Sequence, residues 1–208
     1  MALLHRATLR PTKLELLATW LPGRPWYRGP AGVEVRSRGA YRFDDPADAV
    51  GIETMLVGPA DGPVHQVPLT YRAAPLDGAD DWLVGTADHS VLGPRWVYDG
   101  CGDPVYAAVL AHAILSGSGQ AEQYVEVDGR RELREPTMTI VAGNPGAPST
   151  GGVRPTADED ATLVVTDSVE LVVVRRPGLG AVDAAGAVLS GSWDGQPTAV
   201  PLAYARAR

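Results

Sequence analysis

The sequence predicts an α+β protein, in which an antiparallel sheet packs against two helices. Apolar and polar residues alternate with a period of two in several short segments between residues 33 and 98, which is typical of strands with one buried face. Segments that favour helices, each with a capping residue, stand before and after these strands. Glycine (24 residues) and proline (18 residues) are frequent in the 208-residue chain, so we expect many turns and short elements.

The first helix is expected after a short strand within residues 2–9. Thr12 can accept a hydrogen bond from the free amides of the first turn, and Glu15 can bond back to the Thr12 amide, which is the capping-box pattern. Leucines then repeat at helical spacing and give the helix one apolar face: Leu14, Leu17 and Leu21. Pro22-Gly23 ends the helix.

The strands that follow are joined by short turn-forming sequences. They are expected at 33–36, 41–44, 51–57, 64–71, 82–86 and 94–98, with a break at Gly39 between the first two. Short strands that follow one another closely predict an antiparallel meander. A second helix is expected after Asp103-Pro104, because Asp is a favoured N-cap and Pro a favoured first helical residue. Its Ala-rich sequence runs to Leu115 and ends in the SGSG sequence that follows.

Residues 118–208 predict a second, smaller and β-rich part. Strands are expected at 122–127 and 137–141, with Asp128-Gly129 as the turn between them. Residues 143–161 are rich in Gly, Pro, Ser, Thr and acidic residues, which indicates a flexible loop. A hairpin is expected from strands at 162–165 and 169–176, and the last strand is expected at 199–204. We therefore divide the chain into domains 1–117 and 118–208.

Some residue types occur once, and this excludes several kinds of site. Cys101 is the only cysteine, so the chain has no internal disulfide and no cysteine-based metal site. The four histidines form no HExxH or comparable pair, and we expect no metal and no cofactor. Lys13 is the only lysine and follows no Gly-rich loop. Asn144 is the only asparagine and has Thr139, not Asp, five residues before it, so the kinase catalytic-loop pattern is missing.

Charge and hydropathy restrict the partners and the location. The formal net charge of -7 argues against binding to nucleic acid. No apolar run is long enough to span a membrane, and the first residues do not have the pattern of a signal peptide. We therefore expect a cytoplasmic protein.

Aromatic and arginine side chains are the best candidates for a ligand or partner surface. Trp26-Tyr27-Arg28 follows the first helix between proline and glycine residues, so we expect an exposed loop there. Aromatic rings can stack on sugars and arginines can bind a sugar phosphate, which adds three further candidates: Arg72, Arg95 and Trp96. Core packing and ion pairing are the ordinary alternatives for the same side chains.

Two short motifs predict turns more strongly than they predict sites. Asp88-His89-Ser90 has the residue types of a hydrolase triad, but a triad is built from separated positions, so we expect a loop. The segment 99–103 (DGCGD) has acids at both ends, but it lacks the further oxygen ligands of a calcium loop. A turn followed by a capped helix accounts for it.

The densest motif in the chain is HSVLGPRWVYD at residues 89–99. Together with VPLTYRAAPL (67–76), KLELL (13–17) and LPGRPWY (21–27), it resembles the N-terminal cap region of actinobacterial maltokinases. The chain resembles more closely the stand-alone cap-like proteins of about this length, which are often labelled 1,4-alpha-glucan branching proteins. The resemblance covers most of residues 1–117 and implies a curved antiparallel sheet packed against helices.

The second part resembles a kinase N-lobe, the next part of a maltokinase. The sequence VELVVVRRPG (169–178) is similar to the kinase strand that ends in Lys-hydrophobic-aromatic-Arg-Arg. Val172 stands where the resemblance implies the ATP-binding lysine, and a valine cannot pair with phosphate oxygens. The chain ends at Arg208, and we expect no catalytic C-lobe and no catalytic residues.

The resemblance implies a place in maltose, trehalose, glycogen or other α-glucan metabolism. We expect a non-catalytic accessory or regulatory cap-like protein that associates with a sugar-metabolising enzyme or forms a homodimer. The apolar strand 169–174 is expected to be exposed and to offer an edge for pairing. A module that binds maltose, a glucan or a sugar phosphate is the alternative, and part of a sugar kinase is the second alternative.

Overall fold

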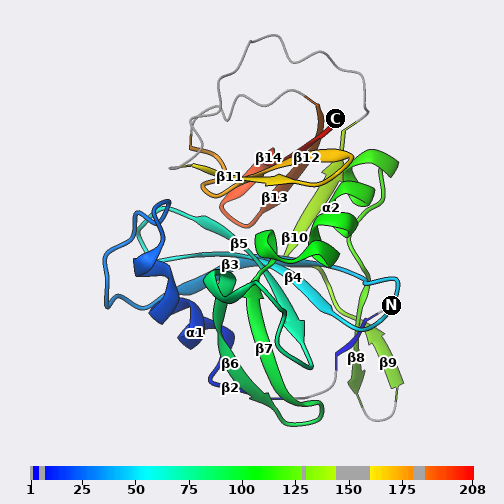
Figure 1. Ribbon diagram of the computed structural model, residues 1–208. Helices are drawn as coiled ribbons and strands as arrows, with labels where there is room; N and C mark the ends of the chain where they lie inside the picture. The colour runs from blue at the N-terminus through cyan, green and yellow to red at the C-terminus, as the bar shows by residue number, and fades with distance from the viewer. Residues whose placement is uncertain (1, 5–7, 128–129, 144–159, 180–185) are drawn as a thin grey trace.

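A computed structural model describes residues 2–4, 8–127, 130–143, 160–179 and 186–208. Two helices and three sheets make up this part of the chain (Figure 1). The helices are α1 (Lys13–Trp20) and α2 (Pro104–Ser116), and three single 3₁₀ turns lie at Leu21–Gly23, Asp80–Trp82 and Gly100–Gly102. The α+β class with a curved antiparallel sheet and two helices is therefore confirmed.

The largest sheet has six antiparallel strands in the order β2-β6-β7-β5-β4-β3. These strands are β2 (Leu9–Arg10), β3 (Arg36–Phe43), β4 (Gly51–Gly58), β5 (His65–Arg72), β6 (Leu83–His89) and β7 (Gly93–Asp99). The expected meander is confirmed for β3, β4 and β5 and for the β6–β7 hairpin, but β5 pairs with β7 and not with β6. The break predicted at Gly39 is wrong. The chain continues through Gly39 as one strand with a bulge, because a shift in register between Ser37 and Gly39 absorbs the irregularity.

Helix α1 covers one face of this sheet. Its capping box is present, since the Glu15 amide donates to Thr12 Oγ1 (3.3 Å) and the Thr12 amide donates to Glu15 Oε2 (2.7 Å). Leu17 and Leu21 are fully buried in a cluster with alternate residues of the sheet, such as Met55 of β4. The helical spacing of the leucines therefore predicted the buried face correctly.

Helix α2 lies on the other face of the sheet. It begins at the N-cap Asp103 as predicted and ends at Gly117, whose φ of 75° is the left-handed conformation that suits glycine. Its Leu110 is buried in a cluster that includes Ile52 of β4, and Ile52 faces away from the α1 side because it is three residues from Met55 along the strand.

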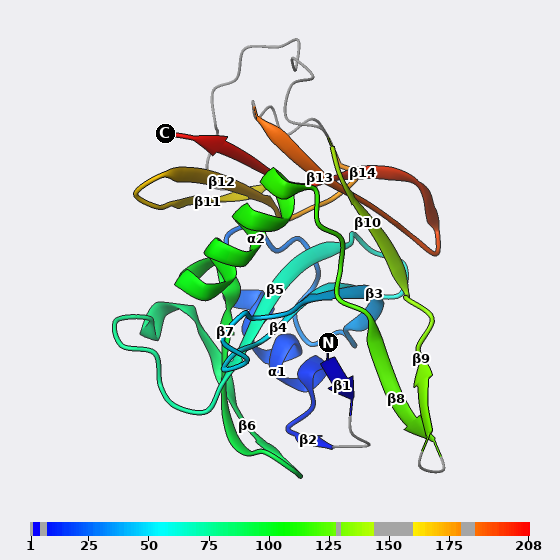
Figure 2. The ribbon, with the colours of Figure 1, turned by 90° about the vertical axis from the view of Figure 1, so that its right-hand side faces the viewer.

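A five-stranded antiparallel sheet covers α2 from the far side, in the order β10-β13-β14-β12-β11 (Figures 1 and 2). Its strands are β10 (Met138–Ala142), β11 (Ala161–Val165), β12 (Val169–Val174), β13 (Ala187–Trp193) and β14 (Gln196–Ala207). Leu171 and Leu202 of this sheet share one apolar cluster with α2 and β4. The boundary at residue 117 stays a prediction, and the core extends across it.

The strand pairing expected at the start of the second half is wrong. The strands 122–127 and 137–141 do not pair. Instead β8 (Gln123–Val127) pairs with β9 (Arg130–Leu133) and, in parallel, with β1 (Ala2–Leu4), while β10 pairs with β13. Strand β9 was not predicted, because the charged sequence RREL has little of the β-branched and aromatic character typical of strands. The expected turn Asp128-Gly129 lies outside the described residues.

Strand β13 was not predicted, and strand 169–174 is not an edge. The hairpin of β11 and β12 is confirmed, but β12 has β11 on one side and β14 on the other. The expected pairing edge is therefore closed by the chain itself. Most of the loop expected at 143–161, namely 144–159, lies outside the described residues.

Candidate functional site

The aromatic loop after α1 is buried, so the expected exposed surface at Trp26 and Tyr27 is wrong. The side chains of Trp26 and Tyr27 are 5% and 9% exposed and belong to the cluster beneath α1. The Trp26 ring lies 5.9 Å from the Trp20 ring, and the Tyr27 ring lies 4.8 Å from the His65 ring. Because large rings gain most from leaving water, the loop folds inward even though its proline and glycine neighbours favour a turn.

His65, the first residue of β5, holds this loop against the sheet. Its Nε2 accepts a hydrogen bond from the Arg28 amide (3.1 Å), and the ring is fully buried. Burial and the positive charges of Arg176 and Arg28 lower the pKa of His65 to about 4. The imidazole is therefore neutral at physiological pH and acts as a hydrogen-bond acceptor. Arg28 itself is exposed, and its guanidinium donates to the Pro25 and Tyr27 carbonyls.

Arg72 and Trp96 are brought together, as cross-strand neighbours on β5 and β7. Directly opposite residues of an antiparallel pair project on the same face, so the two side chains share one face of the sheet. Arg72 makes a two-pronged ion pair with the buried Asp103, at 2.7 Å for each bond. Burial raises the pKa of Asp103, but the bonds from Arg72 outweigh this and lower it. Arg95 is half-buried and donates to the Pro94 carbonyl (2.9 Å).

A buried charge pair joins the two large sheets. Arg175 follows β12 directly and is fully buried, and its Nη2 donates to Oδ2 of Asp99, the last residue of β7 (2.6 Å). Nε of Arg175 donates to the Thr162 hydroxyl of β11 (2.7 Å), and the guanidinium lies 4.6 Å from the Trp26 ring centroid. Burial lowers the pKa of Arg175, but the Asp99 carboxylate outweighs it, so the guanidinium is charged.

Gln66 completes this junction from the side of β5. Its Nε2 donates to the carbonyl oxygens of Val174 (2.9 Å) and Leu202 (2.8 Å), and its amide donates to the Arg175 carbonyl (2.8 Å). All of these groups are buried, and each buried polar group needs a partner to offset the loss of water. The junction therefore fixes the two sheets in one relative position.

A second charged cluster lies on the α1 side of the large sheet. Glu53 of β4 accepts from Lys13 Nζ (2.5 Å) and from the Tyr71 hydroxyl (2.9 Å), and Arg42 Nη1 lies 3.8 Å away. Burial raises the pKa of Glu53, but Lys13 and Arg42 outweigh burial and lower it. The only lysine of the chain therefore holds a helix to a sheet.

The segment 99–103 stabilises the fold through its two acidic side chains. Oδ1 of Asp99 accepts from the Cys101 amide (3.1 Å) while its Oδ2 binds Arg175, and Asp103 binds Arg72 and caps α2. Burial raises the pKa of the Cys101 thiol. No group of three or more potential metal ligands occurs among the described residues, and neither helix of this part has the length and apolarity needed to cross a bilayer.

The tip of the β6–β7 hairpin carries two neighbouring exposed aliphatic side chains. Val91 is 58% exposed and Leu92 is 54% exposed. The turn is rigid, because His89 Nδ1 accepts from both of their amides (3.2 and 3.0 Å) and the Ser90 hydroxyl accepts from the Thr8 amide (3.0 Å). His89 and Ser90 of the Asp88-His89-Ser90 motif therefore shape a turn that presents Val91 and Leu92 to solvent.

Residues 20–103 match the family model of the maltokinase N-terminal cap domain. This part of the chain is a cap-like domain. The match begins at the last residue of α1 and ends at the N-cap of α2, so the cap-like domain contains β3 to β7 with the Arg72–Trp96 face and the hairpin tip. Comparison with the curated proteins gives no match for the chain.

The roles of two junction residues, Arg175 and Gln66, were not predicted from the sequence. Arg175 was placed only within a kinase-like strand, and Gln66 only within the expected strand 64–71. A usable signal was present, since Gln66 directly precedes the apolar residues 67–69 in a strand that is buried over six residues. A polar side chain in such a strand predicts a specific hydrogen-bond partner, although it does not identify that partner.

Proposed function

We propose that the chain is a non-catalytic, cytoplasmic accessory protein of maltose, trehalose or α-glucan metabolism that binds an enzyme of that metabolism. The cap-domain match over residues 20–103 supports the metabolic context. The exposed apolar tip of the β6–β7 hairpin, within that match, is the observation that carries the proposal. Exposed aliphatic side chains on a rigid turn are typical of a protein-binding surface.

The arrangement of charged side chains in the described residues supports a non-catalytic role. The strongest candidates for chemistry are engaged with one another: Lys13 with Glu53, Arg72 with Asp103, and Arg175 with Asp99. A catalytic acid or base must be free to exchange a proton with a substrate, whereas each of these carboxylates accepts a hydrogen bond from its cationic partner.

The kinase-like character of the second half is part of the same proposal. Val172 projects from β12 between Leu163 of β11 and Tyr204 of β14, which are its direct cross-strand neighbours. A row of this kind supplies no cation to phosphate oxygens, whereas nucleotide binding in kinases uses a lysine on the equivalent strand. We therefore propose that this half supports the cap-like domain and does not transfer phosphate.

Biolayer interferometry tests the proposal by measuring the binding of the purified protein to purified maltokinase and to purified α-glucan-metabolising enzymes. The double variant Val91→Asp/Leu92→Asp is expected to lose at least about 1.4 kcal/mol of binding free energy, which is a tenfold change in Kd. Leu179→Asp is the matched control, because Leu179 is similarly exposed (47%) and lies outside the cap-like domain. Turnover of ATP with maltose by the protein alone contradicts the proposal, as does equal binding by both variants.

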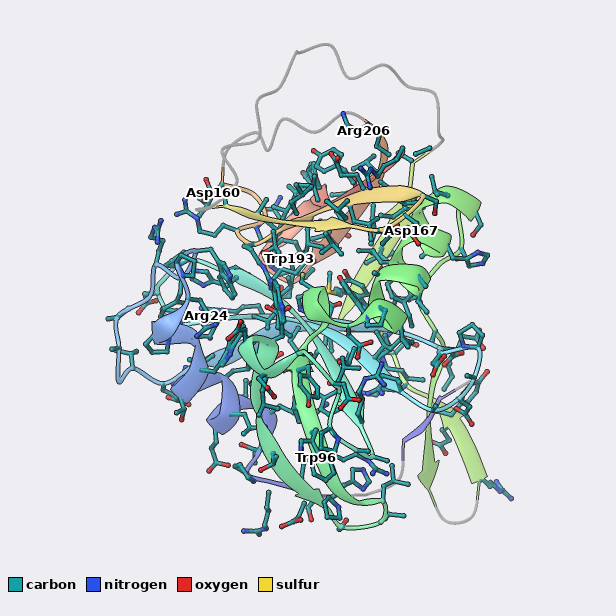
Figure 3. All side chains as sticks on the ribbon, viewed as in Figure 1. Arg24, Trp96, Asp160, Asp167, Trp193 and Arg206 are labelled. Carbon is teal, nitrogen blue, oxygen red and sulfur yellow. The ribbon has the colours of Figure 1, made fainter. Side chains whose placement is uncertain are left out.

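A sugar-binding module is the second candidate, favoured by the Arg72–Trp96 pair. The partly buried indole of Trp96 (Figure 3) stands next to a fixed guanidinium–carboxylate pair. Together they offer a stacking face and planar hydrogen-bonding groups, which are the groups that carbohydrate sites use. Titration with maltose, maltose 1-phosphate and glycogen, followed by tryptophan fluorescence, tests this candidate. A response that Trp96→Leu removes supports it, and no response in the wild type excludes it.

A further inference from the structure

The chain closes most of its sheet edges with its own groups. At the outer edge of β3, the Ala40 amide donates to the Thr137 hydroxyl (2.9 Å), and the Ala121 amide donates to the Arg42 carbonyl (2.8 Å). At the outer edge of β10, the Gln120 side chain donates to the Met138 carbonyl (3.1 Å) and accepts from the Ile140 amide (3.2 Å). Such closure prevents pairing with other chains.

The outer edge of β11 has no such closure among the described residues. Strand β11 is the last strand of its sheet, and Figures 1 and 2 show its outer side without a neighbouring strand. At the two ends of the β11–β12 ladder, the Arg175 amide donates to the Asp160 carbonyl and the Thr166 amide donates to the Val169 carbonyl. Hydrogen-bonded pairs alternate along an antiparallel ladder. The residues that bond to β12 are therefore Asp160, Thr162, Val164 and Thr166.

The three residues between them direct their backbone groups outward. Ala161, Leu163 and Val165 each place an amide and a carbonyl on the open edge, because each strand residue forms its backbone bonds on one side only. The same residues project on the outer face of the sheet, where Leu163 is 40% exposed and Val165 is 53% exposed. The strand ATLVV has no charge, no proline and no bulge, so it lacks the devices that protect edges.

We propose that β11 pairs with β11 of a second copy of this chain, in antiparallel orientation about a twofold axis at Leu163. This register places Leu163 opposite Leu163 of the second copy and Ala161 opposite Val165. Each of these is a hydrogen-bonded pair, so about six backbone hydrogen bonds join the copies and use every outward group of the strand. The five-stranded sheets become one continuous sheet.

The chemistry of the strand favours a second copy over an unrelated partner. The register is self-complementary, and Asp160 lies opposite Thr166, so no like charges of the described residues face each other across the strands. The apolar row Leu163–Val172–Tyr204 continues into the same row of the second copy. Two copies that each carry a net charge of -7 repel one another, so an uncharged strand is the more favourable place for them to pair. Strand β11 carries no charged residue. The inference goes beyond the proposed function, since a dimer requires no enzyme partner.

Sedimentation of the full chain over a wide concentration range tests the proposal. The wild type is expected to form a dimer, and Leu163→Lys to weaken it at least about tenfold, because two ammonium groups then meet at the axis. Val141→Lys is the matched control. Val141 is 60% exposed and lies on β10, the opposite edge of the same sheet, which Gln120 closes. This variant is expected to dimerise like the wild type.

Cysteine cross-linking tests the register independently of stability. Leu163→Cys places two thiols across the axis with Cα atoms about 5.5 Å apart, which suits a disulfide. Cys101 is buried, so the introduced thiol is the reactive one. A covalent dimer from Leu163→Cys, and none from Val141→Cys, supports the proposal. A wild type that is monomeric at all concentrations overturns it, as does a dimer that Leu163→Lys does not weaken. Loss of enzyme binding in the hairpin-tip variant leaves this dimer intact, so the two proposals fail separately.

Discussion

The Asp99–Arg175 pair gives the sharpest test of how the two halves are held together. Asp99→Asn keeps the size of the side chain and one acceptor oxygen for the Cys101 amide. It removes the negative charge that faces Arg175, whose side chain is fully buried. The guanidinium is then left as an uncompensated charge in the core, with the Thr162 hydroxyl, the Gln66 carbonyl and the Trp26 ring as its other contacts.

The expected cost is large compared with the stability of a domain. Removing one partner of a buried ion pair costs about 3–5 kcal/mol, because the remaining charge has lost its solvation and gained nothing. The free energy of unfolding of a typical domain is about 5–15 kcal/mol. With a urea m-value of about 2 kcal/mol per M, the midpoint of unfolding falls by about 2 M.

Equilibrium urea unfolding, followed by tryptophan fluorescence and far-UV circular dichroism, measures this change. The variants are Asp99→Asn, Arg175→Met and the double variant. Replacing both partners leaves no buried charge, so the double variant is expected to be more stable than Asp99→Asn. The reasoning is refuted if Asp99→Asn lowers the free energy of unfolding by less than about 1 kcal/mol, because that is the contribution of an ion pair exposed to solvent. A double variant less stable than both single variants also contradicts the reasoning.

Three further predictions concern the helix cap and the titratable groups. Thr12→Ala is expected to lower the free energy of unfolding by about 1 kcal/mol in urea melts, because it removes the capping box of α1. Thr19→Ala, at an exposed site within the helix, serves as its control. His65 has a folded-state pKa of about 4, below its usual value near 6.5, so the unfolded state binds the proton first and stability falls as the pH drops from about 6.5 to 4. In His65→Gln this part of the pH dependence of urea midpoints is expected to vanish. Glu53 has a lowered pKa in the folded state, so its contribution to stability is present above the usual glutamate pKa and is lost as the pH falls through the folded-state pKa. Glu53→Gln is expected to flatten the dependence of stability on pH only in that more acidic range.

The local elements of the first half of the chain were predictable because their causes are local. The two capping-box residues are three positions apart, the leucine repeat spans two turns of helix, and Asp103 caps the helix that starts beside it. Alternation of apolar residues likewise identifies a strand from its own residues. Strands β9 and β13 were not predicted, because their cause is not local. Charged or glycine-containing sequences form strands only where a neighbouring strand can hydrogen-bond to them.

The candidate surface at Trp26 and Tyr27 failed because exposure is not a local property. Proline and glycine predict that a segment turns, but the direction in which its rings point depends on what else needs covering. Here the guanidinium of Arg175, from a strand far along the chain, lies against the Trp26 ring. A sequence pattern contains no record of that approach.

The sequence by itself determined the class of fold, the two helices with their caps, most strands of the large antiparallel sheet and the likeness to a maltokinase cap. The tertiary structure alone decided which polar groups are buried, which edges are closed and which apolar residues face water. Asp99 and Arg175 meet across 76 residues of chain, and the pairing of such groups follows from the packing of two sheets on one helix. Local patterns depend on hydrogen bonds and periodicity within a few residues, whereas burial depends on surfaces that come together only when the chain has folded.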